Sequence, residues 1–216
     1  MKFLLTAINA KFIHSNPAIY SLRAGVGEKL QLYVELAEFT INESLESILE
    51  GIWKRQPKVI GFSCYIWNWK LIREILTELP KILPDTEIWL GGPEVTYDGP
   101  GLLSEFPQVT GIMVGEGEVT FREVLEQYVQ AADRTGTVTG NSVAERFGQI
   151  PGLCLASGYT APRELTDLTT LPFLYEDMEP FTNRIIYYET SRGCPYRCSY
   201  CLSSIDKKVR LRDIDV

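Results

Sequence analysis

The sequence has 216 residues, of which 45% are hydrophobic and 11% aromatic. This composition is typical of a globular chain with a buried core, and it excludes a disordered or low-complexity protein. The formal net charge of −7 argues against nucleic acid or an anionic membrane as the main partner. No apolar run approaches the roughly 18 to 20 residues needed to cross a bilayer, so we expect a cytosolic protein that does not insert into membranes.

Short apolar runs alternate with helical patterns over the first 130 residues. Strands are predicted at residues 2–8, 32–39, 58–63, 87–90 and 109–114, and helices at residues 18–30, 44–55, 69–79 and 120–131. Continuously apolar strands separated by helices are typical of a parallel sheet that is covered on both faces. We therefore predict an α/β domain over residues 1–132, with a five-stranded, parallel, doubly wound sheet of the flavodoxin or Rossmann type.

Ligands of such sheets bind beyond the carboxyl ends of the strands, where the strand order reverses. The loops that follow the first, third, fourth and fifth strands are therefore the predicted binding site. Residues 133–183 have a different character, with a loop-like stretch at 135–142, a short hairpin near 150–155 and prolines at 162, 172 and 180. We interpret them as a connector. A further strand is predicted at residues 184–190.

Three cysteines follow that last strand in the pattern C-x3-C-x2-C: Cys194, Cys198 and Cys201. Three thiolates this close can bind three irons of a [4Fe–4S] cluster and leave the fourth iron open to a small molecule. There are two alternatives: a zinc site with a distant fourth ligand, or three unrelated thiols. The first is disfavoured because no second Cys or His pair lies nearby in the sequence. Cys64 and Cys154 belong to no such group, and we interpret them as structural thiols.

The cysteine segment, with Tyr200 directly before the third cysteine, resembles the radical S-adenosylmethionine (SAM) superfamily. The resemblance implies that Cys194, Cys198 and Cys201 ligate a [4Fe–4S] cluster and that SAM binds its open iron, near Tyr200. It further implies reductive cleavage of SAM to a 5′-deoxyadenosyl radical, a small-molecule substrate, and an electron donor such as flavodoxin or ferredoxin.

The first 132 residues resemble the cobalamin (B12)-binding domain of those radical SAM enzymes that have one. Such domains carry Ser-x-Leu after the third strand, Gly-Gly after the fourth, and also the Gly-Glu-Gly-Glu sequence found here after the fifth. The third-strand signature is altered, because Cys64 and Tyr65 follow the serine. The resemblance implies that cofactor contacts come from Ser63, Tyr65, Gly91, Gly92, Pro93, Glu94, Gly115 and Glu116.

The Asp-x-His-x-x-Gly signature expected after the first strand is absent. His14, the single histidine, lacks both the preceding Asp and the following Gly, so we do not expect histidine as the lower ligand of the cobalt. His14 is either a polar loop residue or a contact to substrate or cofactor. The aromatic residues between Tyr65 and Trp69 either cover a flat ligand or pack against the sheet and the next domain.

The complete pattern resembles the N-terminal part of the enzymes grouped with the anaerobic magnesium-protoporphyrin IX monomethyl ester cyclase, which include methyltransferases, cyclases and ring-rearranging enzymes. A radical SAM methylthiotransferase and a non-catalytic cobalamin-binding or sensor module are the alternatives. Because a β/α barrel needs on the order of 200 residues, residues 184–216 provide only its start. We therefore expect the 216-residue chain to be inactive as an enzyme by itself.

Overall fold

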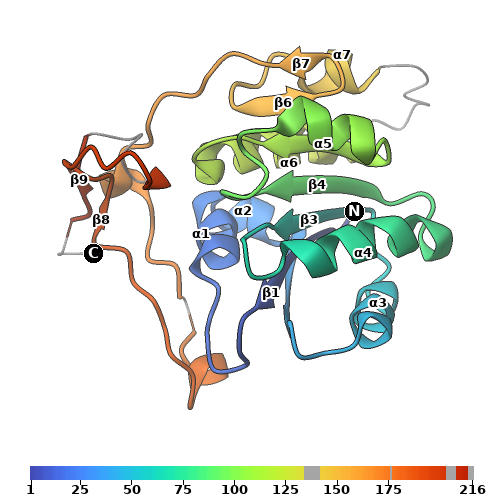
Figure 1. The fold of residues 1–216 in the computed structure, drawn as a ribbon, viewed down its shortest axis with the longest axis horizontal. Coiled ribbons are helices and arrows are strands. Elements are labelled where there is room, and N and C mark those ends of the chain that lie inside the picture. The colour runs from blue at the N-terminus through green and yellow to red at the C-terminus, as the bar shows by residue number, and fades with distance from the viewer. Residues whose placement is uncertain (134–141, 176, 203–207, 214–216) are drawn as a thin grey trace.

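A parallel sheet forms the centre of the molecule (Figure 1). The computed structural model of the protein describes residues 1–133, 142–175, 177–202 and 208–213. The central strands are β1 (Phe3–Asn9), β2 (Val34–Thr40), β3 (Val59–Ser63), β4 (Glu87–Gly91) and β5 (Val109–Met113). They lie in the order β2-β1-β3-β4-β5, and each neighbouring pair is parallel. This order is that of flavodoxin-like sheets, so the predicted five-stranded parallel sheet is confirmed.

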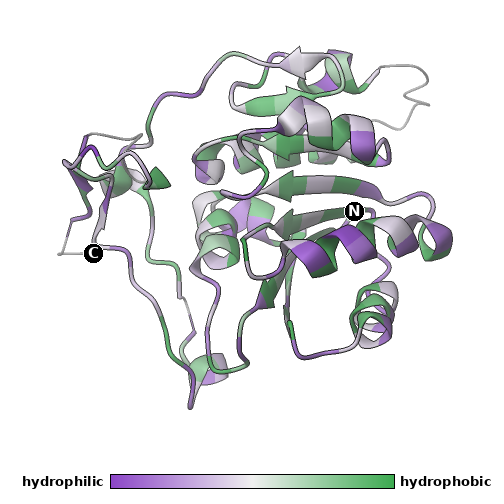
Figure 2. Cartoon of the chain, viewed as in Figure 1, coloured by the Kyte–Doolittle hydropathy of each residue, from purple (hydrophilic) through white to green (hydrophobic). Residues whose placement is uncertain are grey.

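Helices cover both faces of this sheet. One apolar core lies between the sheet and the helices α3 (Leu45–Trp53), α4 (Trp69–Ile82) and α5 (Gly99–Glu105). A second core lies on the other face, under α1 (Pro17–Gly25), α6 (Gly117–Asp133) and α7 (Val143–Phe147). Figure 2 shows the apolar strands between helices whose surfaces are partly polar. Burial on both faces explains why the strands read as continuous apolar runs.

Glycines account for two differences from the predicted helices. The helix predicted at 18–30 is divided into α1 and the short α2 (Glu28–Gln31), because Gly27 between them has a φ of 79°, which helices of L-residues do not adopt. The helix α5 was not predicted, because its first turn reads Gly99-Pro100-Gly101 and glycine has a low helix propensity.

The connector adds two strands to the main sheet. The predicted hairpin is present as β6 (Leu153–Leu155) and β7 (Gly158–Tyr159), and β6 pairs antiparallel with β5. The helix α7 before it was not predicted. The Ser142 side chain accepts a hydrogen bond from the Glu145 amide, and the Glu145 carboxylate accepts one from the Ser142 amide. The loop predicted at 135–142 lies outside the described residues, except for Ser142.

The strand predicted at residues 184–190 is wrong. Within this stretch, Ile185 alone forms a bridge, to His14. A strand needs a neighbouring backbone to pair its N–H and C=O groups along its length, and in the described part of the chain only this single bridge is supplied. Among the described residues after 184, the strands are limited to one pair of two residues each, β8 (Ser191–Arg192) with β9 (Arg210–Leu211). Two 3-10 turns, Leu168–Thr170 and Glu179–Phe181, precede it.

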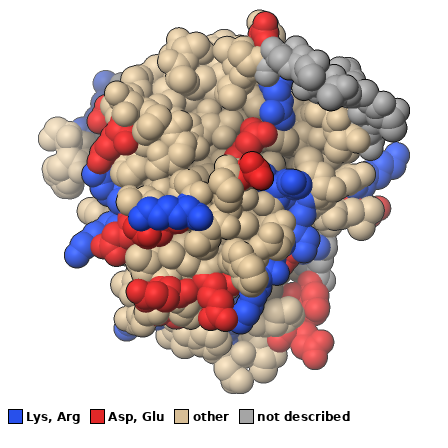
Figure 3. Space-filling model, turned by 90° about the vertical axis from the view of Figure 1, so that its right-hand side faces the viewer, with Lys and Arg blue, Asp and Glu red and all other residues tan. Residues whose placement is uncertain are grey.

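Charged side chains of both signs lie next to one another on the face shown in Figure 3. Exposed ion pairs such as Lys54 with Glu50 and Lys81 with Glu78 add to this mixed surface, and such pairs contribute little to stability. Among the described residues, no helix is both long and apolar enough to span a membrane.

Candidate functional site

A cavity of about 740 Å³ opens at the carboxyl end of the sheet, where the chain leaves β1 toward one side and β3 toward the other. In Figure 1 the arrowhead of β4 points toward this edge, where the C-terminal segment lies. The cavity lies within the size range of small-molecule and cofactor sites. Its walls come from α1, from the turns after β3, β4 and β5, and from the C-terminal segment. The predicted location of the site is therefore the location of the cavity.

The inner wall of the cavity is apolar and includes Phe3, Leu5 and Trp89. Trp89 donates its indole N–H to the Tyr128 hydroxyl at 2.8 Å, so its one polar group is paired within the protein. Gly61 on β3 also lines this wall. A Cβ atom there would lie 3.2 Å from the Phe3 ring and 3.3 Å from the Leu5 side chain, so the glycine leaves room at the surface of the sheet.

Ser63 ends β3 and lines the cavity. Its hydroxyl oxygen is buried and has no hydrogen-bond partner among the described residues. A buried polar group left without a partner costs about 1–3 kcal/mol. The hydroxyl is therefore available to a polar group of a ligand in the cavity.

A buried asparagine fixes the turn after β3. The Asn68 amide nitrogen donates to the carbonyl oxygens of Ile8 at 3.0 Å and Ser63 at 2.9 Å, and its oxygen accepts the Tyr65 amide at 2.8 Å. Tyr65 lines the cavity, and its ring stacks on Trp67 with centroids 4.4 Å apart. Asn68 thus ties the ends of β1 and β3 to the aromatic turn. Asn68 was not among the predicted site residues. The only sequence signal for it was its position as a capping residue before α4.

The glycine pair after β4 brings two turns into contact. Gly91, Gly92 and Pro93 line the cavity, whereas Glu94 lies outside this lining. Gly92 has a φ of 112°, and a Cβ atom there would lie 2.4 Å from the carbonyl oxygen of Cys64. The second glycine is therefore required for the turns after β3 and β4 to approach each other, in addition to any approach to a ligand.

Cys64 itself is fully buried, and burial raises the pKa of its thiol. This environment disfavours the thiolate and agrees with a structural role. Cys154 is also buried, on β6.

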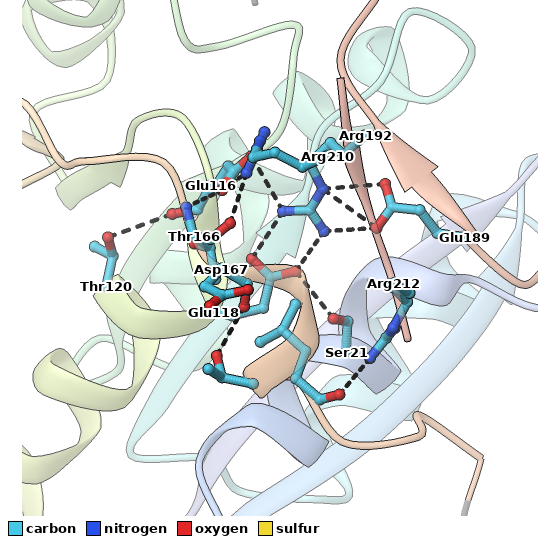
Figure 4. Close-up of polar contacts among 12 residues, drawn as sticks. Ser21, Glu116, Glu118, Thr120, Thr166, Asp167, Glu189, Arg192, Arg210 and Arg212 are labelled. Atoms are coloured by element: carbon cyan, nitrogen blue, oxygen red, sulfur yellow. Dashed lines mark hydrogen bonds and ion pairs between the residues drawn. The ribbon is translucent and has the colours of Figure 1, made fainter. Parts of the chain in front are cut away.

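Five charged side chains at the rim of the cavity form a network, which we call the clamp cluster: Glu116, Glu118, Glu189, Arg192 and Arg210 (Figure 4). Glu116 accepts two hydrogen bonds from Arg210, at 2.5 and 3.0 Å. Glu118 accepts one from Arg192 at 2.8 Å, and Glu189 accepts another from Arg192 at 2.7 Å. The Gly-Glu-Gly-Glu turn after β5 therefore contacts the segment that carries the cysteine triplet.

The surroundings of Glu116, Glu118 and Arg192 favour the charged form of each side chain. Burial by itself would raise the pKa of Glu116, but hydrogen bonds from Arg210 and the Thr166 amide outweigh it and lower the pKa to about 2. The pKa of Glu118 is also lowered, because Arg192 outweighs the effect of burial. Burial would lower the pKa of the Arg192 guanidinium, but Glu189 and Glu118 raise it overall.

Glu116 and Gly115 line the cavity, but both carboxylate oxygens of Glu116 already accept protein hydrogen bonds. Direct contact of Glu116 with a cofactor thus stays a prediction. Glu118, Arg192 and Arg210 were missed as site residues. Their only sequence signal was opposite charge in two distant segments.

The three cysteines of the triplet are not gathered around one point. Cys194 and Cys198 are half-buried and Cys201 is exposed. In the described part of the chain, no group of three His, Cys, Asp or Glu side chains is arranged to hold a metal ion. Tyr200 is 91% exposed and does not line the cavity. The arrangement described here does not fit a bound cluster, and ligation by the triplet stays a prediction.

His14 lies outside the cavity lining and contacts the C-terminal segment. Its Nδ1 atom shares a short hydrogen bond with the Tyr187 hydroxyl, and the two rings stack with centroids 5.7 Å apart. Its backbone forms the bridge to Ile185. The structure thus favours the interpretation of His14 as a polar loop residue.

Comparison with known proteins gives three findings. The B12 binding domain family matches residues 4–125. TokK of Streptomyces tokunonensis, named a cobalamin-dependent radical SAM methyltransferase, is 32% identical over 68% of this chain and 22% of its own length. The anaerobic magnesium-protoporphyrin IX monomethyl ester cyclase of Cereibacter sphaeroides is 25% identical over 73% of this chain and 26% of its own length.

A solved structure of OxsB, a cobalamin-dependent SAM radical enzyme with aqua-cobalamin and SAM bound, covers 98% of this chain and 30% of OxsB. The TM-score is 0.71 at 18% identity, which shows a shared fold. The chain spans about a quarter of the length of the curated relatives it matches.

Proposed function

Because the B12 binding domain family matches more than half of its length, the chain belongs to that family, and we propose that the cavity at the carboxyl edge of the sheet binds cobalamin. The family match confirms the resemblance first based on the serine after β3 and the glycine pair after β4. The shape and polarity of the cavity support the proposal. Its apolar inner wall suits the nucleotide portion of cobalamin, and its polar rim suits the amide groups around the corrin ring.

The observation that carries this proposal is the unpaired hydroxyl of Ser63. It lies at the end of β3, beside the strand at which the sheet order reverses, and Ser63 is among the residues that line the cavity. A hydrogen bond to the ligand would remove the cost of the buried unpaired oxygen. Tyr65, held by Asn68, would contact the ligand from the adjacent turn.

Titration of the 216-residue chain with hydroxocobalamin tests the proposal. We expect a change in the cobalamin spectrum that saturates in the micromolar range. The variant S63A should raise the Kd by about 5- to 10-fold, which corresponds to one hydrogen bond of roughly 1 kcal/mol. The matched control S47A changes an exposed serine on α3 and should bind like the wild type. No binding at high micromolar ligand would contradict the proposal.

We further propose that the full-length protein is a cobalamin-dependent radical SAM enzyme. Two observations support this proposal: the spacing of Cys194, Cys198 and Cys201, and the fact that TokK is named a radical SAM methyltransferase. Bound cobalamin supplies a cobalt centre that can carry a methyl group, and the relative with the higher identity of the two is named a methyltransferase. Methyl transfer is therefore the reaction we favour over cyclisation or rearrangement. A small-molecule substrate, SAM and an electron donor belong to the same proposal.

The protein's own residues have defined tasks under this proposal. Phe3, Leu5 and Trp89 exclude water from the inner part of the cavity. Ser63 orients the ligand, and the turn from Tyr65 to Asn68 borders it.

Iron and sulfide analysis of the full-length protein after anaerobic reconstitution tests the second proposal. We expect close to four irons and four sulfides per chain, and their loss in the variant C198A. A protein that binds cobalamin but takes up zinc or no metal would contradict the radical SAM proposal. That result would favour the alternative of a non-catalytic cobalamin-binding module.

A further inference from the structure

The segment with the cysteine triplet leaves and returns to the sheet domain at one place. Arg192 on β8 lies two residues before Cys194, and its partner across the strand pair is Arg210 on β9. The Arg212 amide adds one further hydrogen bond, to the Thr190 carbonyl at 2.8 Å. This strand pair therefore closes the base of a loop that carries all three cysteines.

The strand pair is too short to be stable by itself. Each strand has two residues, and isolated two-stranded hairpins are marginal in water even when they are longer. Arg192 and Arg210 are also directly opposite each other, and like charges in this position destabilise a strand pair. Some other group must compensate this repulsion.

Glu116 supplies the compensating charge to both arginines. Its carboxylate forms ion pairs with Arg210 at 2.5 Å and with Arg192 at 3.4 Å. Glu118 forms a second ion pair with Arg192 at 2.8 Å. One turn of the sheet domain, after β5, thus contacts both ends of the cysteine loop (Figure 4).

These ion pairs are shielded from water. The Glu118 side chain is 6% exposed and that of Arg210 is 9% exposed. Removing one partner of a shielded pair leaves an uncompensated charge, which is far more costly than the loss of a surface pair. Loss of either glutamate should therefore destabilise the strand pair of β8 and β9.

The clamp cluster also borders the cavity. Glu116, Glu118, Glu189 and Arg192 line it together with Gly193, the residue directly before the first cysteine of the triplet. The position of the cysteine loop and the shape of the cavity wall are consequently set by the same contacts.

We propose that Glu116 and Glu118 are positioning residues that hold the base of the cysteine loop against the rim of the cavity by neutralising Arg192 and Arg210. The role of these contacts, which is to place the cysteines beside bound cobalamin, rests on the proposed function. Its structural content, the dependence of the strand pair on the two carboxylates, is independent of any ligand.

Hydrogen–deuterium exchange of the 216-residue chain without cobalamin tests the clamp. In the variants E116Q and E118Q, we expect the amides of residues 191–192 and 210–212 to exchange at least about tenfold faster. The amides of β3 and β4 should keep their protection, which would show that the sheet domain remains folded. The matched control E123Q removes a carboxylate on α6, the helix that also carries Glu118, but this carboxylate pairs with Arg163. It should leave exchange at residues 191–192 and 210–212 unchanged.

A second-site variant separates charge neutralisation from general packing. If Glu116 acts by relieving the repulsion between Arg192 and Arg210, the double variant E116Q/R210Q should exchange more slowly in β8 than E116Q alone. Equal or faster exchange in the double variant would overturn the neutralisation argument. Unchanged exchange in both E116Q and E118Q would overturn the clamp as a whole.

The hydroxocobalamin titration then links the clamp to the ligand. We expect E118Q to raise the Kd about fivefold, because the wall made by Arg192 and Gly193 is released, and E123Q to leave it unchanged. Faster exchange with an unchanged Kd would overturn the link to the cavity. If the wild type binds no cobalamin while the exchange results hold, the proposed function fails and the clamp stands.

Discussion

The sheet domain and the segment after residue 184 are held in place by different forces. The sheet domain has two apolar cores whose side chains, such as Ile75 and Phe121, are fully buried. The later segment has many exposed apolar side chains, including Tyr187 and Tyr188, and its contacts to the sheet domain include the ion pairs of the clamp cluster and the Arg184–Glu38 pair. Apolar burial involves no titrating charge and is not screened by salt, whereas ion pairs are screened by salt and lost when the acid is protonated. The two regions should therefore respond differently to the same perturbation.

The largest expected effect comes from a cavity in the sheet domain. Ile75 on α4 is fully buried, and I75A should lower the free energy of unfolding by about 2–5 kcal/mol. The matched control I82A changes a half-exposed residue of the same helix and should cost much less. Urea unfolding measured by circular dichroism checks both. Similar losses in the two variants would show that the core does not dominate the stability of this region.

The next effect in size concerns the contact between the turns after β3 and β4. G92A places a Cβ atom 2.4 Å from a carbonyl oxygen at a φ of 112°, and strain of this kind costs on the order of 1–3 kcal/mol. The control G27A has a similar positive φ of 79° but open space around the new atom. We expect G92A to have the lower urea midpoint. If the two midpoints agree, the close approach of the turns contributes nothing beyond the backbone conformation.

Acid should release the later segment before it unfolds the sheet domain. The pKa of Glu116 falls from 4.5 to about 2 in the folded protein, so its ion pairs contribute stability above pH 4.5 that is lost as the pH falls toward 2. The protection factors of residues 191–192 and 210–212 should thus be constant between pH 5 and 8 and decrease below about pH 4.5. In E116Q this decrease should be smaller. A sheet domain that loses protection at the same pH would contradict the distinction between the two regions.

The smallest effect is expected from an exposed ion pair. Glu50 pairs with Lys54 on α3, and both side chains are more than 60% exposed. E50Q should leave the urea midpoint unchanged within error, because water and salt screen such pairs. A loss as large as that of I75A would show that surface charge contributes more to the sheet domain than its cores suggest.

The sequence predicted the sheet well because the signal for it is local. Each parallel strand is an apolar run, and each long helix has an apolar face, so both patterns can be read within a short window. The location of the cavity followed from the strand order of the fold class. Periodicity alone missed two features: the break at Gly27, which divides one predicted helix, and the helix α5, whose Gly-Pro-Gly start is not typical of a helix.

The contacts of the later segment could not be predicted in the same way. The strand expected at residues 184–190 depends on a partner that sequence patterns do not identify. Glu116 and Arg210 are 94 positions apart, and no periodic pattern joins them. Asn68 was missed because three hydrogen bonds, to Ile8, Ser63 and Tyr65, define its role, and only the folded chain brings these groups together.

The hairpin of β6 and β7 has a consequence for how the sheet domain can be handled in isolation. β5 would be the last strand of the parallel sheet, and β6 covers its edge through the pairs Ile112 with Cys154 and Met113 with Leu153. An uncovered strand edge is a template for association with other chains. A protein cut after α6 would expose the backbone of β5 at Ile112 and Met113, and we expect it to self-associate more than a protein that keeps the hairpin. We therefore expect residues 153–159 to reduce self-association of the sheet domain at this edge.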